Sequence, residues 1–511
     1  MSTFGVKLSL FWSKHLSWFS FLQVYKNLGD SKFCGFYEQL KPSLMVAEPD
    51  LVKTVLIRDF DHFVDRRRVK FTSERDEIFN QLLSRASGDH WRSLRSILSP
   101  NFTTGRMKGM FNLVALKADA LLDYINRKLK TQQMITLKRC FGLYTLEVIS
   151  SCAFGMETNS LADENSVFNT MTENLFKPPT TAMRIKYILF RMYPQFCEAL
   201  KINFTQPEID FFKEVVQEAL EQREKGGHRG DFLDLMMEAR DNNKKESAIG
   251  SLKYPVTNST VAAQSVLFLL AGYDTTANAL CFTTFLLAQH PEQQQRLRRE
   301  LKELILRHDT FTYQAIMDAN YLDACISESL RLYPPGTLHR TAVHQAVQVR
   351  HSRALSNGGV FAIFEDKWSV NLAVTDQDSP KFSLVHKSGD SILPGTDVVV
   401  PRSTMVFVPI WSLHHDPRYW SQPSAFLPDR FLPENRDKVV SAAYLPFGLG
   451  PRNCIGMRFA LMEAKLALAK VFLEFEVSCV PGQDHLILSQ QLGLMRPSSD
   501  LSLVFTPLDK H

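Results

Sequence analysis

Residues 447–456 read FGLGPRNCIG and match the pattern F-x-x-G-x-R-x-C-x-G at every fixed position. Ordinary residue frequencies give a chance expectation on the order of 10⁻⁴ for such a match in a chain of this length. Gly450 and Gly456 allow backbone conformations closed to other residues, so the loop can approach a flat cofactor and present Cys454 to a metal. A thiolate is the ligand that haem iron accepts where a protein promotes cleavage of the O–O bond.

The residues around Cys454 suit a thiolate ligand. The segment from residue 457 onward is rich in helix formers, and a helix N-terminus beside the sulfur would favour the thiolate. Arg452 is a permanently charged fork suited to a haem propionate, and Phe447 would shield the sulfur from water. A buried structural cysteine in an ordinary strand-to-helix turn is the alternative at this point.

A second motif, AGYDTT at residues 271–276, lies in a long apolar stretch without proline that predicts a buried helix. Together with the cysteine loop it resembles the cytochrome P-450 family, and the resemblance covers roughly residues 20–511. It implies that the small residues Ala271 and Gly272 leave room for a diatomic ligand on the oxygen-binding helix and that Asp274 and Thr275 form a proton relay. A helix cap or a kink is the alternative explanation of the motif.

Two further pairs match motifs of the same family. Glu328 and Arg331 lie at i and i+3 on a helix closed by two prolines, and the resemblance implies a buried structural triad with Arg430 of the segment PDRF. Without the resemblance, such a pair would be an ordinary surface ion pair. Trp91 and Arg95, at i and i+4, match the family's propionate clamp, although any amphipathic helix with an aromatic anchor would look the same.

Arg340, which follows PPGTLH, fills another position where the family places a propionate ligand. Arg66, in the run DRRR, is a weaker candidate, because such basic runs are more often solvated loops.

The pattern of apolar residues predicts a mainly α fold with a small β-sheet. The resemblance implies the same fold, with haem between a long central helix and the C-terminal cysteine loop. Absence of any linker, repeat or low-complexity tract favours one domain over residues 26–511. Helices are predicted at 104–129, 206–225, 256–290, 291–307, 321–333 and 457–475, and β-rich stretches at 42–46, 398–408 and 501–505.

Two segments depart from the family. Residues 1–25 hold no transmembrane anchor of the microsomal kind; they are either an interfacial amphipathic helix or the product of a truncated or mispredicted first exon. About forty extra residues at 345–386 are either a retained intron read in frame or a genuine loop. The apolar patch at 187–196 falls where microsomal relatives dip a loop into the bilayer, so peripheral contact with the cytoplasmic face of the endoplasmic reticulum is expected.

Composition excludes several other classes. A net charge of +5 over 511 residues, without a basic stripe, argues against nucleic acid as a partner. The eight cysteines have neither CxxC nor zinc spacing, so we expect reduced thiols. A hydrophobic content of 45% and 37 phenylalanines suit a large core with an apolar substrate cavity.

The resemblance therefore implies a haem b monooxygenase that inserts one atom of O₂ into a lipophilic substrate, most like the animal microsomal branch with drug-metabolising and insect or crustacean detoxifying members. No nucleotide-binding glycine fingerprint appears, so electrons would come from NADPH through cytochrome P-450 reductase, with cytochrome b5 as a second candidate donor. The alternatives are a haem-thiolate isomerase or synthase and a catalytically silent haem-binding protein.

Overall fold

The computed structural model describes residues 18–38, 41–66, 71, 73–226, 229, 231–247, 254–343, 391–392, 399–401, 404–482, 485–488, 494–497 and 501–509. The chain divides into two compact units, each assembled from separate segments of the sequence. Unit 1 comprises Met1–Arg67, Gly336–Pro423 and Val440–Asn453, and unit 2 comprises Arg68–Pro335, Ser424–Val439 and Cys454–His511. The prediction of a single domain stays a prediction.

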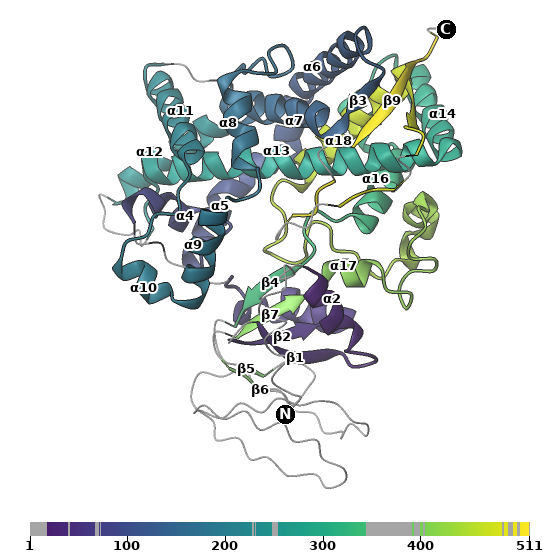
Figure 1. Ribbon diagram of the computed structural model, residues 1–511. Coiled ribbons are helices and arrows are strands. Elements are labelled where there is room, and N and C mark those ends of the chain that lie inside the picture. The colour runs from purple at the N-terminus through teal and green to yellow at the C-terminus, as the bar shows by residue number, and fades with distance from the viewer. Residues whose placement is uncertain are drawn as a thin grey trace, which may run out of the picture. The chain divides into compact units, whose positions relative to one another are not determined.

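Unit 2 is mainly helical (Figure 1). Its helices are α4 (Glu77–Gln81), α5 (Gly88–Leu98), α6 (Thr104–Leu129), α7 (Leu137–Phe154), α8 (Val167–Leu175), α9 (Thr181–Met192), α10 (Pro194–Ala199), α11 (Pro207–Glu224), α12 (Phe232–Ser247), α13 (Asn258–Gln289), α14 (Pro291–His308), α15 (Tyr313–Met317), α16 (Asn320–Leu332) and α18 (Met457–Glu474). Short 3₁₀ turns lie at Glu74–Asp76, Ser99–Phe102, Pro428–Phe431 and Pro433–Lys438.

Helix α13 is the central element of unit 2, running its length in Figure 1. It packs closely on α7, because a Cβ on Gly142 would lie 3.1 Å from the Tyr273 hydroxyl and one on Gly272 would lie 2.9 Å from Ile149. Among the described residues it is the one helix long and apolar enough to cross a membrane. Because 72% of its most apolar 18-residue window is buried, it has the character of a core helix.

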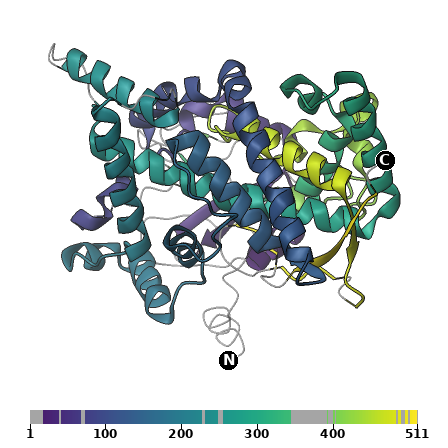
Figure 2. The same ribbon diagram turned by 90° about the horizontal axis from the view of Figure 1, so that it is seen from above.

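Helices α6 and α18 lie side by side on the same unit (Figure 2). The Lys470 ammonium of α18 donates to the Ala115 carbonyl of α6 at 3.1 Å. A three-stranded antiparallel sheet, ordered β3 (Met134–Thr136), β9 (Ser502–Pro507) and β8 (Phe475–Cys479), completes unit 2, and β8 directly continues α18.

Unit 1 is built on a four-stranded sheet ordered β1 (Phe33–Glu38), β2 (Lys41–Val46), β7 (Met405–Val408) and β4 (His339–Ala342). The β2–β7 pair is parallel and the other two pairs are antiparallel. Phe407 packs against Phe21 and Phe36, with ring centroids 5.2 Å from each. The other elements of this unit are α2 (Trp18–Lys26), α3 (Pro49–Lys53), the π-helix Thr54–Arg58, the 3₁₀ turns Phe60–His62 and Ser441–Ala443, α17 (Ile410–His414), and the strand pair β5 (Ser391–Ile392) and β6 (Val399–Val400).

The predicted fold class is confirmed, and each of the six predicted helices begins and ends within two residues of its prediction. The predicted β-rich stretch at 398–408 is two separate strands, β6 and β7, which pair with different partners. The predicted insertion at 345–386 and all but the last eight residues of the 1–25 segment lie outside the described residues.

Candidate functional site

The cysteine loop needs glycine at position 450 for two reasons. Gly450 has φ of +77°, where an L side chain is strained, and a Cβ there would lie 1.9 Å from the Leu56 carbonyl oxygen. The sequence predicted that Gly450 lets the loop approach a cofactor closely. In the structure Gly450 closely approaches the backbone of Leu56 in unit 1, and its contact with a cofactor stays a prediction. Gly456, which caps the N-terminus of α18, has an ordinary φ of −87°.

Cys454 differs from the other seven cysteines. It is exposed, five of the others are buried, and all eight are free thiols. This exposure excludes the alternative of a buried structural cysteine. Burial raises the pKa of the Cys34 thiol to about 11 and that of Cys152 further, so these groups stay protonated at neutral pH.

Two features of unit 2 favour negative charge on the Cys454 sulfur. Helix α18 begins at Met457, so its positive N-terminal end lies next to the thiol along the chain. The Arg95 guanidinium of α5 is close enough to interact with it: burial lowers the pKa of Arg95, and the charge on Cys454 raises it in part. Trp91, one turn earlier on α5, is buried. The predicted helical pair thus lies on one element near the cysteine.

Unit 1 gathers cationic side chains around His339, which the sequence reasoning missed. Burial, with Arg66 and Arg452 nearby, lowers the pKa of His339 to about 3, so the imidazole is neutral. The buried Arg452 donates to the Val64 carbonyl. The group combines two guanidinium forks with a neutral imidazole, which suits it to binding carboxylates.

Arg340 follows His339 on β4 and therefore projects from the opposite face of the sheet. Its guanidinium carbon lies 5.6 Å from the centroid of the Phe407 ring. The sequence predicted a propionate ligand at this position. That role of Arg340 stays a prediction. The sequence signal for His339 was only its place directly before Arg340.

Asp274 on α13 is buried and held by three donors. Lys138 of α7 donates to Oδ1 at 2.6 Å, and Oδ2 accepts from Arg496 at 2.9 Å and from Asn278 at 3.1 Å. Burial raises the pKa of Asp274, but the two cations outweigh it and the pKa lies below its usual value. The group is therefore an ionised carboxylate at neutral pH. The lysine and the arginine were missed because both are distant in sequence.

The Thr275 hydroxyl donates to the Ala271 carbonyl at 2.6 Å, which leaves its oxygen lone pairs available as acceptors. Ala271 is exposed although most of α13 is buried, so a small residue faces open space beside the hydroxyl. The sequence also expected Gly272 to make room for a diatomic ligand. Its contact with Ile149 shows that it serves the packing of α7 on α13.

The predicted triad is present within unit 2. Arg331 donates twice to Glu328, from Nε at 2.7 Å and from Nη2 at 2.8 Å, and both side chains are fully buried. Arg430 Nε lies 3.3 Å from the same carboxylate. The Leu427 backbone N–H also donates to it, at 3.0 Å. The carboxylate of Glu328 thereby ties α16 to Leu427 and Arg430. Arg331 adds a bond to the Ala425 carbonyl at 3.1 Å.

These residues fit a haem with a thiolate ligand. Unit 2 offers an exposed thiol at a helix N-terminus, a guanidinium near it and a small exposed residue on α13. Unit 1 independently offers a set of carboxylate-binding groups suited to propionates.

Comparisons with known proteins agree with this donor set. The family model described as Cytochrome P450 matches residues 6–360 and 384–505. The chain is 33% identical to Cytochrome P450 3A11 of Mus musculus over 498 residues, which cover 96% of this chain and 87% of that protein. It is 32% identical to Cytochrome P450 3A5 of Homo sapiens over 489 residues, or 94% and 85% of the two chains. The chain belongs to the cytochrome P450 family of haem b monooxygenases, in which a cysteine thiolate is the axial ligand.

Proposed function

We propose that this monooxygenase inserts one atom of O₂ into an apolar organic substrate, with electrons delivered from NADPH by a separate cytochrome P-450 reductase and with cytochrome b5 as a second donor. Haem b, when bound, supplies the reductive activation of O₂. The observation that carries the proposal is that one unit contains both the exposed Cys454 thiol at the start of α18 and the Asp274–Thr275 pair on α13.

The residues have distinct proposed roles. Cys454 binds the iron, with Phe447, Gly450 and Gly456 shaping its loop, and Ala271 leaves space on α13. By the family's pattern the propionates are held by Trp91, Arg95, Arg340 and Arg452, and Arg66 is a further candidate; the surroundings of His339 support adding it to this group. Asp274 and Thr275 move protons. Glu328, Arg331 and Arg430 hold the scaffold.

Reconstitution with reductase and a panel of lipophilic compounds tests the proposal. We expect substrate-dependent NADPH consumption coupled to formation of an oxygenated product. An isomerase or synthase would form a rearranged product from a peroxide substrate without NADPH, and a silent protein would bind haem but form no product. Either result would overturn the proposed reaction.

Thr275→Ala is expected to leave haem content unchanged while the yield of product per NADPH falls on the order of tenfold and hydrogen peroxide rises, because the variant removes a hydroxyl from the proton relay. Both products are measured against NADPH consumption. Thr283→Ala is the matched control, since that hydroxyl makes the same bond to the carbonyl four residues earlier, at 2.8 Å, and lies two turns further along α13. Equal coupling in the Thr275 and Thr283 variants would contradict the role of Thr275.

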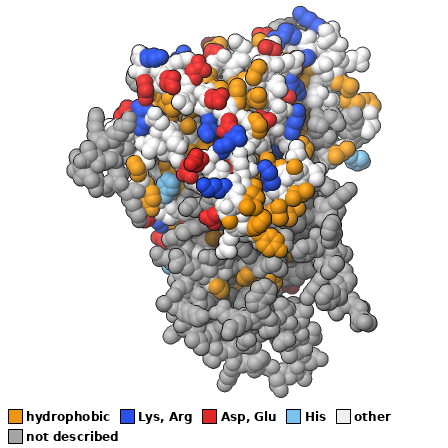
Figure 3. Space-filling model, turned by 60° about the vertical axis from the view of Figure 1, so that its left-hand side comes forward, with side chains coloured by type: hydrophobic (Ala, Val, Ile, Leu, Met, Phe, Trp, Pro, Cys, Tyr) orange, Lys and Arg blue, Asp and Glu red, His pale blue; other side chains and the backbone are white. Residues whose placement is uncertain are grey.

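Helices α9 and α10 carry the exposed apolar surface that we propose contacts the membrane of the endoplasmic reticulum at its cytoplasmic face. Hydrophobic side chains gather on this side of unit 2 (Figure 3). Six of the large hydrophobic side chains on α9, on α10 and in the residues that flank α10 are at least 41% exposed: Ile185, Tyr187, Ile188, Tyr193, Phe196 and Leu200. An apolar patch of this kind typically marks an interaction surface, and the bilayer is the occupant proposed here.

Ile188→Asp with Phe196→Asp is expected to reduce binding to phosphatidylcholine vesicles by about tenfold or more, because burying each side chain in lipid is worth about 1.5–3 kcal/mol. Flotation of wild type and variants measures the bound fraction. Leu306→Asp is the control, because Leu306 is 82% exposed on α14, outside the patch. Unchanged flotation of the double variant would exclude α9 and α10 as the contact.

A further inference from the structure

Arg496 contacts the acid of the proposed proton relay and a second helix at the same time. Its Nε donates to Asp274 at 2.9 Å, and its Nη1 donates to the backbone carbonyl of Phe176 at 2.9 Å. Phe176 is the C-cap residue of α8, and the Arg496 guanidinium carbon lies 5.2 Å from the centroid of its ring. One side chain therefore joins α13 to the end of α8.

The other cation at Asp274 has no such second partner on α8. Lys138 is the second residue of α7, and its ammonium also donates to the Asn278 side-chain oxygen on α13 itself, at 2.8 Å. Helices α7 and α13 are packed tightly at Gly142 and Tyr273, so Lys138 is fixed by the same contact that fixes α13. Of the two cations, Arg496 is therefore the one whose bond to the Asp274 carboxylate depends on the position of α8.

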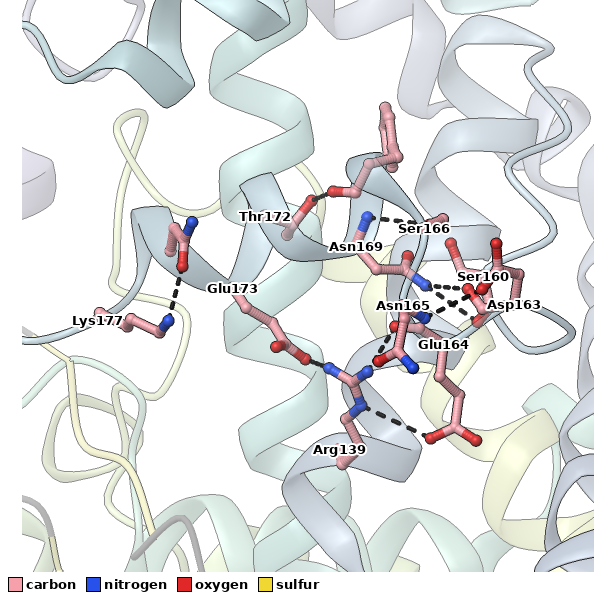
Figure 4. Close-up of polar contacts among 12 residues, drawn as sticks. Arg139, Ser160, Asp163, Glu164, Asn165, Ser166, Asn169, Thr172, Glu173 and Lys177 are labelled. Carbon is pink, nitrogen blue, oxygen red and sulfur yellow. Dashed lines mark hydrogen bonds and ion pairs between the residues drawn. The ribbon is translucent and has the colours of Figure 1, made fainter.

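The rest of α8 is anchored independently (Figure 4). Arg139 of α7 forms an ion pair with Glu173 of α8 and donates to the Glu164 backbone carbonyl. Asn169 of α8 donates to the backbone carbonyls of Ser160 and Asp163 at 3.1 Å and 2.8 Å. These bonds hold the body of α8 against α7 and the preceding loop. The bond from Arg496 holds its C-terminal end, which leads through residues 177–180 to the exposed α9.

Phe176 also touches the helix of the acid directly. Its ring packs on Tyr273, with centroids 5.0 Å apart, and Tyr273 immediately precedes Asp274. Lys138 lies 5.6 Å from the centroid of the same tyrosine ring. The end of α8, the residue before the acid and both cations thus form one contiguous cluster, and a shift of the α8 end must move Arg496, Tyr273 or both.

The balance of charge around Asp274 determines how the loss of Arg496 would affect this carboxylate. Two cations face the single carboxylate of Asp274, so the cluster carries one excess positive charge. Without Arg496, Lys138 still neutralises the carboxylate, but Oδ2 keeps only Asn278 as a donor. The carboxylate then gains freedom to turn, and its affinity for a proton rises, since one of the two cations that oppose protonation is gone.

We propose that Arg496 is a positioning residue, which fixes the orientation and charge of the Asp274 carboxylate and makes both depend on where the end of α8 lies. This rests on the proton-relay role proposed above for Asp274. The relay would thus respond to the state of the helix that leads to the apolar α9 surface.

Arg496→Gln and Arg496→Lys separate the two halves of the proposal in the haem-loaded protein. The glutamine variant loses the charge and is expected to shift the acid limb of the coupling–pH profile to higher pH, because the pKa of Asp274 rises. Product per NADPH should fall severalfold. The lysine variant keeps the charge and is expected to restore the acid limb. The lysine side chain is too short to bond both the Asp274 carboxylate and the Phe176 carbonyl. This variant should therefore not restore the protection of residues 167–180 from amide hydrogen exchange.

Three controls keep the outcomes distinct. Arg307→Gln removes an exposed arginine paired with Glu303 and should change neither readout. Asp274→Asn should lower coupling by itself, and adding Arg496→Gln to it should cause no further loss. If Asp274→Asn leaves coupling intact, the proposed relay role of Asp274 is wrong. If Asp274→Asn lowers coupling, but Arg496→Gln has the pH profile and the amide hydrogen exchange of the wild type, the proposed role of Arg496 is wrong. Should the glutamine variant fail to load haem, unchanged exchange in Arg496→Lys overturns the link to α8 and faster exchange supports it.

Discussion

Cys454→Ser is expected to abolish the red-shifted absorption band that the reduced protein forms with carbon monoxide. The band depends on a thiolate as axial ligand, and the serine hydroxyl stays protonated at neutral pH and is a poor ligand for this iron. NADPH-coupled product formation should fall below detection. Haem can still associate through the residues proposed to bind its propionates. The haem content therefore reports on those residues, and the absorption spectrum reports on the axial ligand.

Cys34→Ser is the matched control for this variant. Burial raises the pKa of the Cys34 thiol to about 11, so this cysteine is not a thiolate at neutral pH and its replacement should leave the band intact. The decisive comparison is the spectrum of the wild type with that of each variant. A wild-type spectrum like that of a histidine-ligated haem protein would show that Cys454 does not bind the iron.

The helices that could be predicted are those whose sequence signals are local. Helix α14 begins at Pro291, a favourable first residue, and α18 is a run of strong helix formers after Gly456. Helix α7 was not predicted, because nearly every side chain in it is buried and it lacks an amphipathic period. The strand pairing in the sheet of unit 1 was equally hidden, since β2 pairs in parallel with β7 across about 360 residues, Ser43 with Met405.

The site shows the same division. Cys454, Asp274, Thr275 and Glu328 could be named as candidates because each belongs to a contiguous motif of the family. Contacts between distant segments could not be identified in this way: Lys138 and Arg496 converge on Asp274 from α7 and from the C-terminal segment.

Side-chain direction on short strands was equally out of reach. Arg66 and Arg452 lie near His339 and help to lower its pKa, and the propionate role of its neighbour Arg340 stays a prediction. Because side chains alternate along a strand, the register of β4 decides which face each of these two residues takes, and no local signal in the sequence fixes that register.

Glu328→Gln is expected to destabilise the fold by about 3–5 kcal/mol, since it leaves the fully buried Arg331 guanidinium without its counter-charge. Unfolding in urea and haem retention measure the effect. Glu303→Gln is the matched control: the Glu303–Arg307 pair is also helical but more than 60% exposed at both side chains, and its loss should cost at most about 0.5 kcal/mol.

A compensating variant distinguishes a stranded charge from lost packing. Glu328→Gln combined with Arg331→Met removes both charges, so the double variant should be more stable than the sum of the two single losses predicts. Recovery is expected to be incomplete, because the Leu427 N–H and the Ala425 carbonyl would each lose a charged partner. Strictly additive losses would mean that the two side chains stabilise the fold independently, and the structural role of the triad would have to be abandoned.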